Sequence, residues 1–132
     1  ITAVLDAYRA RQPRTCAALR EMRALAESMA SALVAGDVDL LGRLVGAHWE
    51  HQRALHPAIT TPRIDAILDA AMRAGALGGK ALGASGGGCV LVVARDEHVE
   101  AVRAAVAALG VPLPFTIDQR GCHVSRDAEG TT

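Results

Sequence analysis

The centre of the chain reads Gly75-Ala-Leu-Gly-Gly-Lys-Ala-Leu-Gly-Ala-Ser-Gly-Gly-Gly-Cys89, and this stretch says most about the fold. Seven of its residues are glycine, against 13 in the whole chain. Glycine at this density costs backbone entropy, and it leaves the backbone free to adopt positive φ or to approach another group closely. The usual reason for such a run is an anion or a substrate held at the backbone amides.

The residues around the glycines predict a β-hairpin. Residues 77–84 and the apolar run 89–94, which holds three valines, each favour a strand. In the dinucleotide-binding fingerprint the glycines open a helix instead. A P-loop is also excluded, because the spacing from Gly75 to Lys80 is one residue short and Ala81 replaces the hydroxyl residue that holds magnesium. Two interpretations stay open from the glycines alone: a loop that forms an amide nest for an anion, and a bulged hairpin without a ligand.

Before the glycine stretch the pattern is helical. Apolar residues recur at helical spacing over 22–33, 38–55 and 64–72, which predicts three helices. Each expected boundary has a local signal, either a glycine or proline that ends a helix or a side chain that caps one. These boundary residues are Gly36, Asp37, Pro57, Thr61 with Pro62, and Gly75.

After the hairpin we expect one more helix, capped by Asp96, and one more strand over 115–124. The order helix, strand, strand, helix, strand is typical of a ferredoxin-like split β-α-β plait that lacks its first strand. The expected fold is therefore a single α+β domain with an antiparallel sheet. Its helical half spans 1–75, its strand-strand-helix-strand half spans 76–125, and residues 126–132 form a flexible tail.

The glycine stretch resembles the third signature motif of the GHMP kinases, the family of galactokinase, homoserine kinase and mevalonate kinase. That motif runs Gly-Ala-x-Gly-x-Lys-x-x-Gly-Ala-Gly-Gly-Gly-Gly-Cys, and the chain follows it from Gly75 to Cys89. The stretches 48–55 and 60–65 resemble the sugar-kinase branch, above all kinases of heptose phosphates, which commonly carry Gly-Ala-Leu-Gly-Gly-Lys. Ser85 departs from the motif at a position where glycine is usual. Cys89 stands where the heptose-kinase branch often has an aromatic residue.

The resemblance covers residues 38–125, and it implies that the chain is the C-terminal domain of an ATP-dependent sugar or sugar-phosphate kinase. An N-terminal domain outside this chain is then expected to bind ATP and Mg²⁺ and to hold the catalytic residues, so the chain alone is expected to be inactive. The glycine motif is expected to line the cleft between the two domains and to support the phosphate loop. The supporting residues are Lys80, Gly83, Ala84, Ser85, Gly86, Gly87 and Gly88.

The helix that begins near residue 61 is a second candidate site, for substrate. Thr60, Thr61 and Arg63 lie at its start, where free backbone amides attract anions. The alternative is that the two threonines are ordinary helix caps.

A polar stripe at spacing i, i+4 is formed by His48, Gln52 and His56. It has two interpretations, a surface that faces substrate or a partner domain and a solvated surface, and we favour the second. We expect no metal site here, because Glu50 and His51 do not share the face of His48. Trp49 is expected to pack in a core or an interface.

Composition narrows the class of protein. The chain has 14 basic and 14 acidic residues, a balance that argues against a nucleic-acid or anionic-membrane partner. No apolar run approaches the roughly 20 residues needed to span a bilayer. Three widely spaced cysteines indicate reduced thiols and a cytoplasmic protein. Two alternatives to the kinase remain: a stand-alone ligand-sensing module with a plait fold, and a dimerisation module whose helical half forms a homodimer.

Overall fold

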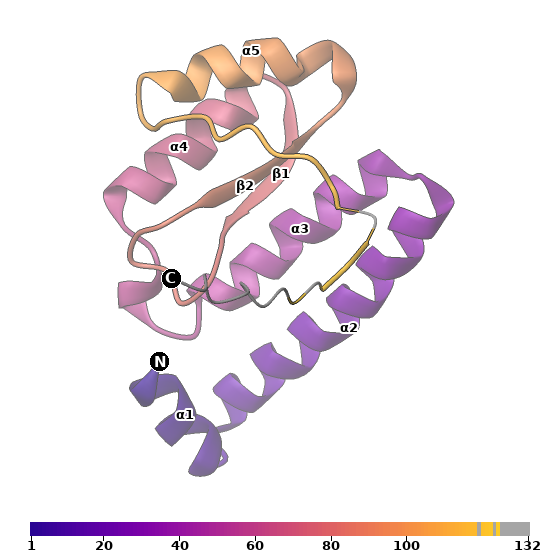
Figure 1. Cartoon of the computed structure of the whole chain (residues 1–132). Helices are drawn as coiled ribbons and strands as arrows, with labels where there is room; N and C mark the ends of the chain where they lie inside the picture. Colours follow the sequence, from indigo (N-terminus) through magenta and orange to yellow (C-terminus); the bar gives the residue numbers. More distant parts are fainter. Residues whose placement is uncertain (119, 123, 125–132) are drawn as a thin grey trace, which may run out of the picture.

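The computed structural model describes residues 1–118, 120–122 and 124, and in this part the chain is an α+β arrangement, as expected (Figure 1). Helices α2 and α3 lie side by side, and α3 contacts the hairpin of β1 and β2. Helices α4 and α5 pack against each other. The elements are α1 (Thr2–Arg9), α2 (Pro13–Ala35), α3 (Val38–Arg53), the 3₁₀ helix η1 (Pro57–Ile59), α4 (Pro62–Arg73), β1 (Ala76–Ala81), β2 (Val90–Ala94) and α5 (Asp96–Ala107).

Local signals set the helix boundaries at several of the expected residues. Gly36 ends α2 in the left-handed conformation, with φ of 69°. Asp37 then caps α3, because its carboxylate accepts a hydrogen bond of 2.8 Å from the backbone amide of Leu40. Thr61 caps α4 in the same way through a 3.2 Å bond from the amide of Ile64. A cap of this kind contributes about 1 kcal/mol. Both helices begin directly after these capping residues, which confirms the predicted starts of α3 and α4.

Two expectations about the elements were wrong. Asp96 does not cap α5 but is its first residue, since Arg95 holds the capping position and makes no capping bond from its side chain. The strand expected over 115–124 is absent among residues 115–118, 120–122 and 124, and the rest of that range lies outside the described residues. The helix predicted over 22–33 is confirmed: it lies within α2, which begins at Pro13 and is preceded by a separate α1.

The two strands pair antiparallel, with Ala81 opposite Val90, and the register shifts between Ala76 and Gly78. Neighbouring residues of a strand point to opposite faces, so α3 and α4 contact β1 from different sides. A Cβ atom added to Gly78 would collide with the carbonyl oxygen of Gly42 in α3. One added to Gly79 would lie 2.7 Å from a methyl carbon of Leu68 in α4. These two glycines of the central stretch therefore serve helix packing and not ligand binding.

The core consists of two small clusters of apolar side chains. Trp49 of α3, which is 3% exposed, packs with Ile64 of α4 and Ala81 of β1. This burial confirms the expected packing role of Trp49. The second cluster joins α4, β1, β2 and α5, and it contains Ala71, Ala76 and Val102, surrounded by Ala74, Val92, Ala94 and Val106. Both clusters involve β1, and its C-terminal end leads into the glycine loop.

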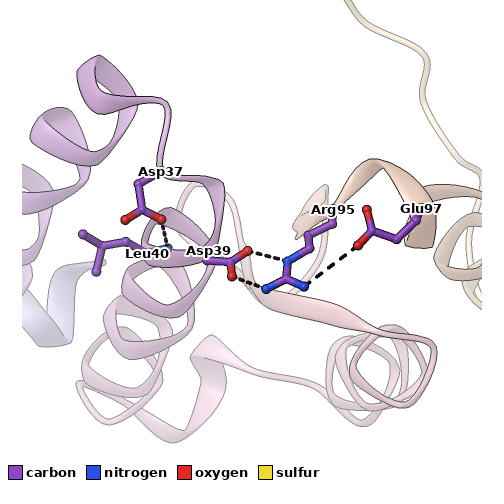
Figure 2. Close-up of polar contacts among 5 residues, drawn as sticks. All are labelled: Asp37, Asp39, Leu40, Arg95 and Glu97. Carbon is purple, nitrogen blue, oxygen red and sulfur yellow. Dashed lines mark hydrogen bonds and ion pairs between the residues drawn. The ribbon is translucent and has the colours of Figure 1, made fainter.

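An ion pair connects the start of α3 with the end of β2 (Figure 2). Arg95 donates to the Asp39 carboxylate from Nε at 2.6 Å and also from Nη2. Its Nη1 lies 3.9 Å from Oε1 of Glu97. The hydrogen bond from Arg95 lowers the pKa of the Asp39 carboxyl below its ordinary value. Asp39 thus stabilises the fold above its unfolded pKa, and this stabilisation is lost as the pH falls through the lower folded value.

We expect Arg95→Ala to return the pKa of Asp39 to its ordinary range and to flatten the acid limb of the stability curve. The ion pair is solvent-exposed, so the change in stability at neutral pH is small. An NMR titration of the Asp39 carboxyl, together with urea denaturation between pH 2 and pH 7, measures both effects. Arg103→Ala removes a charge from an exposed pair with Glu100 and is the control. An unchanged Asp39 titration in Arg95→Ala would contradict the assignment.

Candidate functional site

A cavity of about 530 Å³ lies where the glycine loop meets the C-terminal end of α3, and η1 and α1 complete its rim. This volume is within the range of small-molecule sites. The apolar part of its lining, which we call the apolar wall, includes Ile1, Val4, Leu5, Met22 and Leu55. The polar part, which we call the polar wall, includes His48, Gln52, His56, Lys80 and Ser85, and Gly83 and Ala84 also line the cavity. We call this space the loop cavity.

Lys80 projects from β1 into the loop cavity and is the sole lysine of the chain, beside 13 arginines. Its Nζ lies 3.1 Å from Nδ1 of His48 in α3. Burial lowers the pKa of Lys80. Burial also lowers the pKa of His48, and the charges of Lys80 and His51 add to this effect. A neutral His48 that accepts a hydrogen bond from Lys80 agrees with the lowered pKa of His48, because two positive charges at this distance repel each other.

No carboxylate neutralises Lys80 in the described part of the chain, whose ion pairs all involve arginines. Lysine carries a compact charge with three donors, and one of them points at His48. The ammonium group therefore has donors left for an anion in the loop cavity.

Gln52 connects α3 to the glycine loop through a hydrogen bond. Its side chain is 7% exposed, and Nε2 donates to the backbone carbonyl of Gly83 at 3.3 Å. Its Oε1 is buried and has no hydrogen-bond partner among the described residues. A carbonyl oxygen only accepts hydrogen bonds, and leaving it buried without a donor costs about 1–3 kcal/mol. Gln52 thus offers an acceptor to whatever occupies the loop cavity.

Ser85 has a strained backbone, with φ of 66°. The motif's usual glycine at this position is replaced, yet the left-handed conformation is kept. The Ser85 hydroxyl is buried without a partner among the described residues. The loop around it is anchored, because the amide of Gly86 donates to the carbonyl of Ile59 at 3.0 Å and Leu82 pairs with Cys89 at 2.9 Å. Strain and an unpaired hydroxyl at one residue are typical of a functional position.

We expect Ser85→Gly to raise the free energy of unfolding of this chain by about 1 kcal/mol. The left-handed conformation costs serine about 1–2 kcal/mol, and the unpaired hydroxyl adds to that cost, while the extra backbone entropy of glycine takes back about 0.5–1 kcal/mol. Urea denaturation measures the change. Ala84→Gly, at a neighbour without positive φ, is the matched control and should lower stability. A loss of stability in Ser85→Gly would contradict the strain.

The structure brings only some of the expected site residues together. Lys80, Gly83, Ala84 and Ser85 line the loop cavity. The next three glycines continue the loop and are exposed, and they do not line this cavity; they are Gly86, Gly87 and Gly88. Their expected role in supporting the phosphate loop stays a prediction.

The second candidate site, at the start of α4, lies outside the loop cavity. The Thr61 hydroxyl is occupied as the helix cap, and Thr60 donates from Oγ1 to Asp65 at 2.7 Å. Arg63 is exposed to solvent. Both threonine side chains therefore have local structural partners, which is the alternative that the sequence left open, and a substrate role for the three residues stays a prediction.

The solvated surface favoured for the polar stripe was wrong. His48 contacts Lys80, Gln52 is buried, and His56 also lines the loop cavity, where its Nδ1 accepts from the amide of Ala58 at 3.1 Å. Sequence reasoning placed these residues on one helical face but missed Gln52 as a site residue. The signals that could have found the site were the spacing of this stripe and the presence of a single lysine in an arginine-rich chain.

The described residues contain no helix that is both long and apolar enough to cross a membrane. They also contain no group of three or more His, Cys, Asp or Glu side chains arranged to hold a metal ion.

Comparison with known proteins identifies the family. The family model "GHMP kinases C terminal" matches residues 29–111, which include α3, α4, the hairpin and α5. This chain belongs to the GHMP kinases. The matched range contains the polar wall of the loop cavity, whereas Ile1, Val4, Leu5 and Met22 of the apolar wall precede it.

Curated relatives of this GHMP kinase domain are small-molecule kinases. It is 34% identical over 114 residues to an L-fucokinase/L-fucose-1-P guanylyltransferase from Bacteroides fragilis, a match that covers 82% of this chain and 12% of the relative. It is 40% identical over 109 residues to galactokinase from Mycobacterium tuberculosis, covering 79% and 28%. A mevalonate kinase from Thermococcus onnurineus is 34% identical over 84 residues, covering 64% and 25%. The chain thus spans between 12% and 28% of the length of these relatives.

Proposed function

We propose that this GHMP kinase domain is the C-terminal part of an ATP-dependent kinase that phosphorylates a sugar or a sugar phosphate, with heptose phosphates as the first acceptors to test. The observation that carries the proposal is the loop cavity. Within the matched residues, the strained glycine loop lies beside a half-buried lysine without a carboxylate partner among the described residues, and beside an unpaired glutamine oxygen. The fucokinase and galactokinase among the relatives support a sugar acceptor.

The exposed glycines fit a role beside the transferred phosphate. A Cβ atom added to Gly87 or Gly88 would meet nothing within 4 Å, so another molecule has room to approach the backbone there. Backbone amides in such loops bind anions. ATP supplies the phosphoryl group, and the loop presents no carboxylate to hold Mg²⁺. An N-terminal domain therefore holds the nucleotide and its metal, and Gly86, Gly87 and Gly88 close the phosphate site from this side.

Exposed apolar side chains at α1 support a covering partner domain. Ile1, Leu5 and Tyr8, at the start of α1 and along it, face solvent. Exposed apolar groups that gather on one helix are typical of an interaction surface. In this proposal the partner is the N-terminal domain of the same polypeptide, and a homodimer is the alternative. A cytoplasmic location stays a prediction.

The direct test is ADP release by the full-length protein with ATP and Mg²⁺. The acceptors are hexoses, heptoses and their phosphates. We expect turnover with at least one sugar or sugar phosphate and none with the 132-residue chain alone. Ligand-induced stabilisation of the isolated chain without ADP release from the full-length protein would instead favour a ligand-sensing module.

A further inference from the structure

We propose that the loop cavity binds the phosphate group that the acceptor already carries, through Lys80, and hydroxyl groups of the same molecule, through Gln52 and Ser85. The proposal rests on the proposed kinase function. It assigns to Lys80 a group other than the phosphate that is transferred. The ligand class is a phosphorylated sugar.

The first step of the argument is the charge of the loop cavity. Lys80 is half-buried, contacts His48 at 3.1 Å and takes part in none of the ion pairs of the described residues. A cation withdrawn from water without a counter-ion costs free energy, and an anion entering the cavity removes that cost. The polar wall contains no arginine, although the chain has 13. A single cation matches one phosphate group better than the chain of phosphates of a nucleotide.

The second step is the hydrogen-bond inventory. Gln52 presents Oε1, which only accepts, and the dianion of a phosphate monoester has no proton to donate to it. A phosphate monoester that satisfies both Lys80 and Gln52 must therefore also carry at least one hydroxyl. The Ser85 hydroxyl, which both donates and accepts, suits either group. A sugar phosphate combines these features. An unphosphorylated sugar lacks the anion, and inorganic phosphate has its one O–H on the charged group itself and no sugar hydroxyls.

The third step is the coupling to the glycine loop. Gln52 also donates to the carbonyl of Gly83, and Ser85 is held in its strained conformation two residues further on. A ligand on Oε1 of Gln52 and on the Ser85 hydroxyl fixes the side chain that supports the loop. Binding of the acceptor then orders the loop that closes the phosphate site, and a second ligand binds more tightly to a loop that is already ordered.

The test uses the full-length enzyme and two kinds of measurement. The first is calorimetric binding in the absence of ATP, with hexose and heptose phosphates, their unphosphorylated parents, inorganic phosphate and ADP as probes. We expect a sugar phosphate to bind at least about tenfold more tightly than its parent sugar, which lacks the anion, and than inorganic phosphate, which lacks the sugar hydroxyls. Equal binding of a sugar and its phosphate would overturn the proposal.

The second measurement is the KM of each substrate in Lys80→Met, with Arg103→Met as a control that removes one positive charge from the exposed face of α5. Lys80→Met should raise the KM for the sugar phosphate about 10- to 100-fold, the effect of losing a charge-assisted hydrogen bond. The KM for ATP and the KM for the unphosphorylated sugar should not change. A rise in the KM for ATP alone would assign Lys80 to the nucleotide and overturn the proposal.

Ser85→Ala provides a second variant that keeps the charge of Lys80, and it should raise the KM for the sugar phosphate about 3- to 10-fold.

The proposed kinase function and the proposed phosphate site can fail separately. Turnover of sugar phosphates with an unaltered KM in Lys80→Met would leave the kinase standing and overturn this inference. Tight binding of a sugar phosphate without ADP release would support the inference and contradict the kinase.

Discussion

Gly78→Ala should lower the free energy of unfolding of this chain by about 3 kcal/mol or more. The added methyl group would collide with the carbonyl oxygen and carbon of Gly42, and it would lie 3.1 Å from the amide nitrogen of Gly46. All three atoms belong to the backbone of α3, so no side chain can rotate to make room. Overpacking of this kind costs about 1–3 kcal/mol where neighbours can shift, and more where they cannot.

Gly46→Ala is the matched control for this prediction. Its added methyl would lie 3.7 Å from the Cα atom of Gly78, which is ordinary contact, and alanine favours a helix over glycine by about 1 kcal/mol. The control should therefore be neutral or stabilising on the opposite side of the same contact. Urea denaturation followed by circular dichroism measures both variants. Equal stability of Gly78→Ala and the unchanged chain would show that α3 does not approach β1 as closely as described.

Gly87→Val should reduce the kcat/KM of the full-length enzyme by a factor of about 100 or more while leaving this domain folded. A Cβ atom at Gly87 meets nothing within 4 Å, and Gly87 does not have positive φ, so the domain accommodates the side chain. A phosphate held by the loop amides would lose its approach, and removing one such donor typically costs two to three orders of magnitude.

Two comparisons make the Gly87→Val result interpretable. Gly87→Ala, with a smaller side chain at the same position, should lose less activity. The melting temperature of the domain should stay unchanged in both variants, which separates a blocked phosphate site from a misfolded loop. Full activity with an unaltered KM for ATP in Gly87→Val would exclude the glycine loop from the phosphate site.

The sequence predicted those parts of the fold that depend on neighbouring residues. Gly36, Asp37 and Thr61 set helix ends through bonds that span at most a few positions, and the hairpin follows from apolar runs on either side of the loop. The family likeness rested on consecutive residues from Gly75 to Cys89, so it too was present in the sequence alone. Each of these signals is local, and a local pattern keeps its meaning before the chain folds.

Tertiary structure decided which residues form the site. Gln52 contacts Gly83, and His48 contacts Lys80, across about thirty positions of sequence. The local sequence around these residues indicates neither these contacts nor the burial of Gln52. Packing also gives glycines of the same motif different roles. Gly78 is needed for the close approach of α3, whereas Gly87 faces open space. Helical spacing shows which residues share a face, but only the packed domain determines whether that face meets water, a neighbouring helix or a cavity.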